Sequence, residues 1–319
     1  MAGSIGCMVV LHADPVFLEH DTGRGHPECA ARARVIAAAL AEHPAISRTE
    51  RATALAAPSD LALVHDTGYL AALETAVHEG RNLDADTAVS LRSHEVALKA
   101  AGAVVRATDE AISGAAKLSF CVVRPPGHHA RPARAMGFCL LNNVAVAAAA
   151  AVERAGVERV AVVDFDVHHG NGTQEIFWRD GRVLYVSLHR FPFYPGTGAA
   201  DETGEGDGKG AIANFPLRAG TGSKAYRAAF ERAMDRCRDF KADVIIASAG
   251  FDAYGRDPVG GLGLEVEDYE WIGRQLRGAA EDTAKGRLVS ALEGGYAVDA
   301  LPDLVSAYVT GVANGRGDR

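Results

Sequence analysis

The fold is decided by one stretch of the chain, which reads Val162-Val163-Asp164-Phe165-Asp166-Val167-His168-His169-Gly170-Asn171-Gly172. Arg159-Val160-Ala161 precedes it, so an apolar, β-branched run leads directly into the polar residues. Such a run is typical of a strand buried on both faces of an α/β sheet. The polar residues come where that strand ends, and functional sites gather at the carboxyl edge of such sheets.

Three polar side chains in this stretch are spaced by two residues. Asp164, Asp166 and His168 therefore point the same way if the chain stays extended through them. Two carboxylates and an imidazole this close would repel one another and lose hydration unless a cation lay among them. The spacing predicts a divalent metal site. The alternative is a solvated polar turn in which an aspartate caps a helix.

A second polar motif follows the predicted strand 117–123 and contains two adjacent histidines, in the run Arg124-Pro125-Pro126-Gly127-His128-His129. The two prolines fix the backbone and the glycine lets it turn, so the histidines are held rigidly at the end of the strand. A lone histidine is more often a structural partner. An adjacent pair in this setting favours general acid–base chemistry.

Two further strands also deliver polar residues. Asp252 follows the predicted strand 242–248, and Glu293-Gly294-Gly295-Tyr296 follows the predicted strand 287–292. Because the carboxyl ends of parallel strands meet at one edge, we expect these residues to join the same site.

Strands and helices alternate along the chain without an internal repeat. The remaining strands are predicted at 5–11, 159–163 and 182–189. Helices are predicted at 94–112, 173–178, 222–240 and 265–285. Four more helices are predicted to begin near Pro27, Asp66 or Thr67, Asn142 or Asn143, and Val298. This order predicts one α/β domain over residues 1–319, with a mostly parallel sheet between helices.

Composition narrows the class of protein. The chain of 319 residues is 48% hydrophobic and carries a formal charge of −8, which argues against nucleic-acid binding through phosphate contacts. The cysteines contain no Cys-x-x-Cys pair and indicate reduced thiols of a cytoplasmic protein. No segment reaches the roughly 20 apolar residues of a membrane helix, so we expect no membrane association.

Taken in order, the motifs at 124–129, 164–173, 248–253 and 293–296 resemble those of the histone deacetylase superfamily. The similarity is to its class II branch and bacterial homologues, including acetylpolyamine amidohydrolases, and it extends from Gly25 to Tyr296. The resemblance implies an arginase-like three-layer α/β/α sandwich around an eight-stranded, mostly parallel sheet.

The resemblance also implies the metal sites. Asp166, His168 and Asp252 would bind zinc, leaving the metal open to water and substrate as a catalytic site requires. Iron(II) or cobalt would also suit these ligands. A structural potassium ion is implied next to the zinc site, near Asp164, Asp166, His168, Ser187 and Leu188, and a second near Phe177 and Val183.

The implied catalytic roles are those of a metal-dependent amidohydrolase. His129 would be the general base and later acid, oriented by Asn171, and His128 would be its electrostatic helper, oriented by Asp164. Tyr296 would donate a hydrogen bond to the oxyanion. Other positions would form a narrow channel and its rim, namely Gly137, Phe138, Tyr194, Asp86 and Val259. For Phe138, core packing is the alternative.

The predicted function is removal of acetyl or other acyl groups from lysine side chains. The alternative substrate is an acetylpolyamine or another small N-acyl amine. Val259 is apolar at a place where an acidic gatekeeper can select polyamines, and the loop 80–93 is short for the insertion through which bacterial polyamine deacetylases dimerise. We make no prediction of the oligomeric state.

Two other classes remain open. An arginase-type ureohydrolase would need a second metal and an Asp-x-Asp pattern, whereas Phe251-Asp252-Ala253-Tyr254 offers a single carboxylate. A catalytically silent acetyl-lysine binding protein is disfavoured by the intact set of ligands, histidines and Tyr296.

Overall fold

The computed structural model describes residues 7–48, 53–154 and 156–315. Their centre is an eight-stranded sheet in the order β2-β1-β3-β8-β7-β4-β5-β6, in which every neighbouring pair is parallel. The strands are β1 Val9–His12, β2 Ile46–Arg48, β3 Leu118–Cys121, β4 Val160–Asp164, β5 Val183–Arg190, β6 Ile212–Leu217, β7 Val244–Ala249 and β8 Leu288–Leu292. Part of the predicted first strand, at Ile5 and Gly6, lies outside the described residues.

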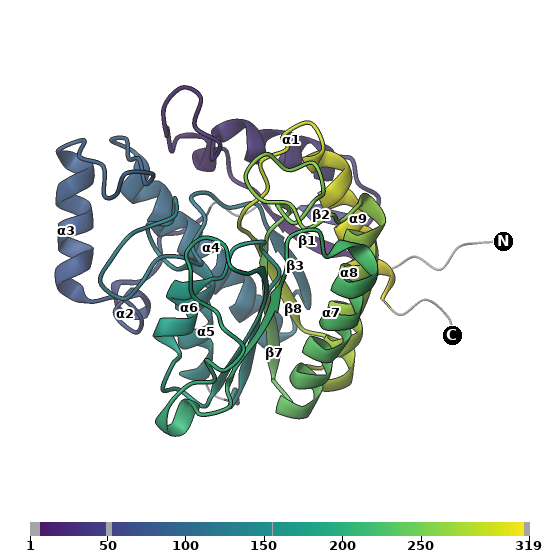
Figure 1. Cartoon of the computed structure of the whole chain (residues 1–319). Coiled ribbons are helices and arrows are strands. Elements are labelled where there is room, and N and C mark those ends of the chain that lie inside the picture. Colours follow the sequence, from purple (N-terminus) through teal and green to yellow (C-terminus); the bar gives the residue numbers. More distant parts are fainter. Residues whose placement is uncertain (1–6, 49–52, 155, 316–319) are drawn as a thin grey trace.

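Helices cover both faces of this sheet, as Figure 1 shows. On one face lie α1 Ala30–Ala41, α7 Gly222–Phe240, α8 Val266–Thr283 and α9 Leu301–Asn314. The other face is covered by α2 Pro58–Leu61, α3 Thr67–His78, α4 Ser93–Ser113, α5 Asn143–Val152 and α6 Asn171–Ile176. Short 3₁₀ helices occur at Pro15–Leu18 (η1) and Gly206–Gly208 (η2). The three-layer α/β/α architecture predicted from the resemblance is confirmed.

Strand β4 shows why the central strands are apolar throughout. Ala161 and Val163 pack in the layer with α7, α8 and α9, whereas Val160 and Val162 pack in the layer with α4 and α5. Side chains alternate between the faces of a strand, so a strand covered on both sides needs apolar residues at every position.

The sequence missed both edge strands. β2 spans only Ile46–Arg48, and β6 contains Pro216, which removes a backbone donor and is compatible with an edge position. Three helix starts also differ from the prediction. α1 begins at Ala30, three residues after Pro27, α9 begins at Leu301, three residues after Val298, and α6 begins at Asn171 rather than Thr173. Asp66 and Asn142 are the N-caps of α3 and α5, each being one of the two candidates that the sequence offered.

The topology brings four polar strand ends together. β3, β8, β7 and β4 are consecutive in the sheet although they are far apart in the chain. Because they are parallel, their carboxyl ends open onto the same edge, and the segments that follow them carry the residues singled out above. This is the position at which α/β sheets bind their ligands.

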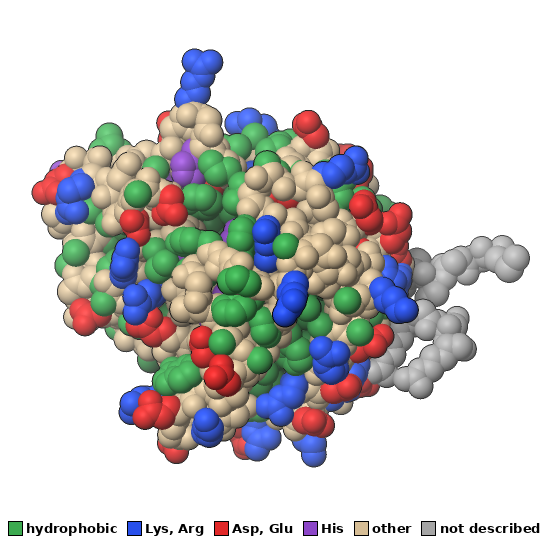
Figure 2. Space-filling view, in the orientation of Figure 1, with side chains coloured by type: hydrophobic (Ala, Val, Ile, Leu, Met, Phe, Trp, Pro, Cys, Tyr) green, Lys and Arg blue, Asp and Glu red, His purple; other side chains and the backbone are tan. Residues whose placement is uncertain are grey.

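The described helices include none with the length and apolar composition needed to cross a bilayer. On the face drawn in Figure 2, basic and acidic side chains are interspersed, so this face carries no large patch of one charge.

Candidate active site

Three buried side chains at the carboxyl edge of the sheet form a cluster that could hold a metal ion. Asp166 and His168 follow β4, Asp252 follows β7, and one ligand atom of each lies within 4.8 Å of the others. His168 Nδ1 is 3.0 Å from Asp166 Oδ1 and 3.2 Å from Asp252 Oδ2. The structure thus brings together the three residues predicted as zinc ligands.

The surroundings of this cluster fit a divalent cation. Asp252 Oδ2 is buried and accepts no hydrogen bond. A Cβ atom at Gly294 would lie 2.1 Å from that oxygen and 2.5 Å from Asp166 Oδ2, so glycine leaves free the space between the carboxylates. Burial, followed by the charge of Asp166, raises the pKa of Asp252 to about 7. Two buried carboxylates, one of which has an oxygen that accepts no hydrogen bond, and an imidazole are suitable ligands for a catalytic zinc ion.

Asp164 is not part of this cluster. The prediction that its side chain points the same way as those of Asp166 and His168 assumed an extended chain, and it is wrong for Asp164. β4 ends at Asp164, and the chain is no longer extended beyond it. The Asp164 carboxylate turns instead to His128, with Oδ2 3.0 Å from Nδ1, and accepts a hydrogen bond of 2.9 Å from Tyr185. A Cβ at Gly170 would lie 2.3 Å from the same oxygen.

The two histidines of the second motif have different partners. His128 pairs with Asp164, whereas His129 Nδ1 lies 2.8 Å from Asn171 Oδ1. Burial lowers the pKa of His128, but Asp164 and Asp166 outweigh it and raise the value to about 10. Burial and the neighbouring charge of His128 lower the pKa of His129 well below its ordinary value. His128 is therefore charged and His129 neutral, which leaves Nε2 of His129 able to accept a proton.

Glu293 holds the histidine turn in place. Its Oε2 accepts hydrogen bonds from the backbone N–H groups of Gly127, at 2.6 Å, and His128, at 3.2 Å, while Oε1 accepts one of 3.0 Å from Ser248 Oγ. Burial raises the pKa of this carboxyl to about 7. Gly137 also supports the pair, because it has φ 56° and its Cβ would lie 2.5 Å from the ring of His129.

Aromatic side chains surround the histidines and Tyr296. The Phe138 ring lies 5.9 Å from Tyr296 and 4.8 Å from His26, and the Tyr194 ring lies 5.2 Å from His129. Phe193, to which the sequence assigned no role, stacks on the ring of His168 at 5.2 Å.

The two residues predicted at the rim, Asp86 and Val259, lie on separate loops. The backbone oxygen of Asp86 is 3.2 Å from His26 Nε2, and the neighbouring Thr87 hydroxyl accepts a 3.3 Å bond from the N–H of Phe138. Val259 belongs to the loop after Asp252, where its N–H bonds to the Asp257 carboxylate.

A buried arginine supports the segment that carries Tyr296. The guanidinium of Arg32 lies 4.9 Å from the centre of the Tyr296 ring and donates to the backbone oxygens of Gly295, at 2.6 Å, and Glu293. Burial raises the pKa of Tyr296 well above its ordinary value, so its hydroxyl is protonated and able to donate.

Arg32 belongs to an ion cluster that the sequence did not reveal. Its Nη1 is 2.9 Å from Glu28 Oε1, and Arg124 contacts both oxygens of Glu28, at 2.5 and 2.7 Å. The three side chains are fully buried. A glutamate four residues before an arginine at the start of a helix is a common surface pair, so the burial of this pair could not be predicted from its spacing.

The predicted potassium site lies where β4 and β5 run side by side. Asp164 and Ser187 are partners in the register of the two strands, and the Ser187 hydroxyl lies 2.9 Å from His189 Nδ1. Ion binding at this place, and near Phe177 and Val183, stays a prediction.

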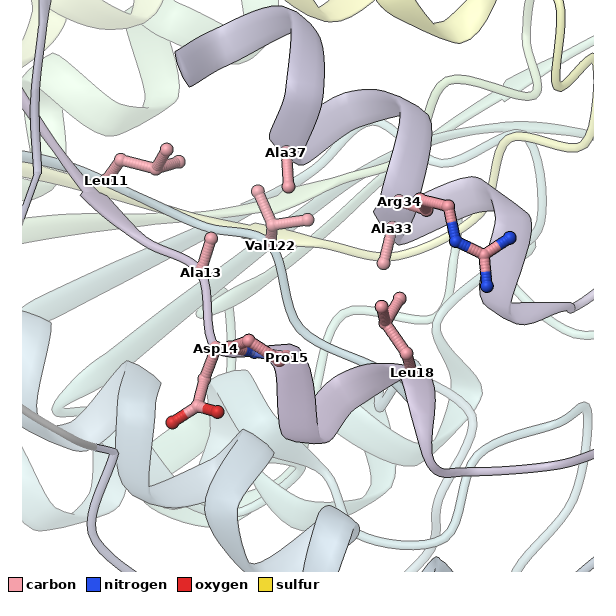
Figure 3. A pocket seen from close by; sticks show the side chains of 9 residues that line it. All are labelled: Leu11, Ala13, Asp14, Pro15, Leu18, Ala33, Arg34, Ala37 and Val122. Carbon is pink, nitrogen blue, oxygen red and sulfur yellow. The ribbon is translucent and has the colours of Figure 1, made fainter.

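A separate pocket of about 360 Å³ lies between β1, η1 and α1, and its lining contains none of the residues above. In Figure 3 apolar side chains such as Ala13, Leu18 and Val122 point into it, whereas the Asp14 carboxylate points away. Asp14 caps η1, accepting a 2.9 Å bond from the N–H of Val16.

Comparison with known proteins agrees with this geometry. The model of the histone deacetylase domain matches residues 26–312. A probable deacetylase of Archaeoglobus fulgidus is 38% identical over 300 residues, which cover 92% of this chain and 82% of the relative. A histone deacetylase-like amidohydrolase of Pseudomonas aeruginosa is 41% identical over 252 residues, covering 77% of this chain and 66% of that protein.

Among solved structures, an acetylpolyamine aminohydrolase of Burkholderia pseudomallei superposes with a TM-score of 0.86 at 31% identity, covering 97% of this chain and 100% of that one. A sheet edge with three candidate metal ligands, a histidine pair and a tyrosine thus coincides with a family match over most of the chain. The chain belongs to the histone deacetylase family of amidohydrolases.

Proposed function

We propose that the protein is a zinc-dependent hydrolase that removes acetyl or other acyl groups from lysine side chains. The observation that carries this proposal is the buried cluster of Asp166, His168 and Asp252, in which Asp252 Oδ2 accepts no hydrogen bond, beside a neutral His129. A metal held by these three side chains would lower the pKa of a water molecule and polarise the carbonyl of the substrate amide.

The protein's own residues would carry the proton transfers. His129 Nε2 takes a proton from the attacking water, because Asn171 fixes the ring through Nδ1 and the low pKa keeps Nε2 unprotonated. The water oxygen forms a bond to the acyl carbon, and the carbonyl becomes an oxyanion. Protonated His129 then delivers its proton to the nitrogen as the C–N bond breaks, which gives a carboxylic acid and a free amine.

The oxyanion would be stabilised by groups already in place. Tyr296 donates its hydroxyl hydrogen to the oxygen, and its high pKa keeps that hydrogen available. The positive charge of His128, whose ring centre lies 4.0 Å from that of His129, favours the accumulating negative charge. Asp164 keeps this charge on His128 and fixes the orientation of the ring.

The residues expected to line the substrate channel support acylated lysine as the substrate. Phe138, Tyr194 and Gly137 would enclose an unbranched acyl-aminoalkyl chain, and Val259 adds no negative charge to attract a polyamine. A groove of about 410 Å³ runs beside Asn171 and Pro195 and would accommodate a peptide flanking the acylated lysine.

An acetylpolyamine or another small N-acyl amine is the second candidate substrate. Supporting it is the full-length similarity to an acetylpolyamine aminohydrolase, at 31% identity. The rim also contains Asp86, whose carboxylate would attract a cationic substrate if it faced the channel.

A ureohydrolase and a silent binding protein fit less well. Within the described residues, the carboxylate and histidine groups that could hold a metal form one cluster, to which Asp252 contributes a single carboxylate after β7. A dinuclear site would require another nearby. A protein that only binds acetyl-lysine would not need a neutral histidine beside the cluster to take up a proton.

Metal-free protein, reconstituted in turn with Zn²⁺, Fe²⁺ or Co²⁺, should be assayed on an acetyl-lysine peptide, longer acyl-lysine peptides, N-acetylputrescine and arginine. We expect metal-dependent acyl release, with kcat/KM higher for the acetyl-lysine peptide than for N-acetylputrescine. The Asp252→Asn variant is the matched control and should lose both metal and activity. Silence on every acylated substrate with metal bound would support the binding protein, and urea from arginine would support the ureohydrolase.

A further inference from the structure

One buried carboxylate joins two segments of the site. Asp257 Oδ2 accepts hydrogen bonds from the backbone N–H groups of Tyr296, at 2.7 Å, and Ala297, at 3.0 Å. Its Oδ1 accepts two more from Val259, at 2.9 Å, and Gly260, at 3.0 Å. A carboxylate that accepts four backbone donors has both oxygens engaged and is held in one orientation.

Both segments matter to the proposed reaction. Asp257 lies on the loop after β7 that also carries Asp252, and the N–H of Gly261 bonds to the backbone oxygen of Asp252 at 2.7 Å. Asp257 therefore connects Tyr296 to the loop that supplies a metal ligand. Arg32 reaches the same segment from the other direction, through the backbone oxygen of Gly295.

The backbone at this point needs such a restraint. Gly295 has φ 118°, a conformation that other residues rarely adopt, so the turn before Tyr296 has little intrinsic preference for its observed shape. Hydrogen bonds on both sides of the turn hold it in place: the N–H of Gly294 donates to Asp166 at 2.8 Å, and the N–H of Tyr296 donates to Asp257.

We propose that Asp257 is a positioning residue that fixes the Tyr296 hydroxyl relative to the metal ligands, and thereby sets the rate of the chemical step. The inference rests on the function proposed above, because it assigns Tyr296 to the oxyanion. Asp257 itself touches neither substrate nor metal. Its loss moves the hydroxyl away from the position at which the oxyanion forms.

A charge effect has to be separated from a positioning effect. After burial and Asp166, the charge of Asp257 contributes to raising the pKa of Asp252. Asp257→Ala removes both the charge and the four hydrogen bonds. Asp257→Glu keeps the charge but displaces the oxygens by one methylene, so a positioning role predicts that both variants lose activity.

The test compares kcat and KM of zinc-loaded protein with an acetyl-lysine peptide. Each Asp257 variant should lower kcat by about 10- to 100-fold, the scale of a 1 Å misplacement, with a much smaller change in KM. In a Tyr296→Phe background the same substitutions should lower kcat less than about threefold, because the hydroxyl that they misplace is already absent. Equal losses in both backgrounds would overturn the proposal.

Amide hydrogen exchange supplies a second readout that needs no activity or metal. The amides of Tyr296 and Ala297 should exchange faster in Asp257→Ala, and unchanged exchange would refute the positioning role even if the wild type hydrolyses no acyl amide. Asp243→Ala is the matched control. Asp243 accepts hydrogen bonds from the backbone N–H groups of Glu158, at 2.8 Å, and Arg159, at 3.1 Å. It lies before β7, at the amino ends of the strands and away from the site, so its loss should leave kcat and the exchange of the Tyr296 amide unchanged.

Discussion

Arg32 and Glu28 form a fully buried ion pair, with 2.9 Å between Nη1 and Oε1, directly behind the ring of Tyr296. Although burial alone would raise it, the charges of Arg124 and Arg32 lower the pKa of Glu28 to about 2. The cluster is completed by Arg124 and contains one carboxylate for two guanidinium groups. It therefore depends on that carboxylate remaining charged.

The Glu28→Gln variant should be destabilised by about 3–5 kcal/mol at pH 7, because it leaves two buried arginines without a carboxylate. In the wild type, the stability from Glu28 is fully present above the ordinary pKa of 4.5 and is lost as pH falls toward about 2. Urea unfolding between pH 2 and pH 7 should therefore show a steeper acid limb in the wild type. Glu95→Gln, which removes the surface ion pairs of Glu95 with Arg92 and Lys99, should cost no more than about 1 kcal/mol.

Tyr296→Phe should lower kcat by about 10²- to 10³-fold, or about 2.7–4 kcal/mol, because one donor to the oxyanion is removed. Zinc affinity should not change, since the tyrosine is not among the ligands. Steady-state kinetics and metal titration measure the two effects. Tyr308→Phe removes a buried hydroxyl that bonds to Ser290, and should leave kcat unaltered. Normal turnover by Tyr296→Phe would exclude the hydroxyl from the mechanism.

Asn171→Asp should shift the acidic limb of the kcat/KM profile upward by about 1–3 pH units. A carboxylate 2.8 Å from Nδ1 raises the pKa of His129, and the ring acts as a base only when it is neutral. Activity should fall at low pH and be retained at high pH. Asn82→Asp adds the same charge to an exposed loop and should leave the profile in place. A profile that is unmoved in Asn171→Asp would indicate a different base.

Val259→Glu should favour polyamines. A carboxylate at this half-buried rim position would attract the distal ammonium of N-acetylputrescine, so kcat/KM for this substrate relative to an acetyl-lysine peptide should rise by about two- to fivefold. Val259→Gln has the same size without the charge and should give no such change. The gain should shrink at high ionic strength. An equal gain in the glutamine variant would point to a steric effect.

The sequence was informative wherever function coincides with a strand end. Asp166, His168 and Asp252 follow apolar runs that could be recognised as strands, and the ordered motifs then indicated the family and its eight-stranded sheet. Asp164 was harder to place from spacing alone. Its direction depends on where β4 stops and on His128, a contact between residues 36 positions apart.

The residues that support the site could not be predicted, for two physical reasons. Arg32 and Glu28 look like a solvated helix pair, and their burial follows only from the packing of α1 against the loop of Tyr296. Asp257 accepts hydrogen bonds from the backbone N–H groups of Tyr296 and Val259. Nearly every residue type has such a group, so the sequence does not indicate these contacts. The edge strand β6 was missed because Pro216 argues against a strand.

That proline has a further consequence, for self-association. The N–H groups of Tyr185 and Phe191 donate to the backbone oxygens of Ala211 and Leu217. The backbone N–H and C=O groups of odd-numbered residues in β6 therefore point toward β5, and those of even-numbered residues point away from the sheet. Pro216 therefore stands where an outward N–H would otherwise invite another strand. At the opposite edge of the sheet, the described part of β2 is three residues long. Both edges of the sheet thus discourage the strand-to-strand pairing that leads to aggregates.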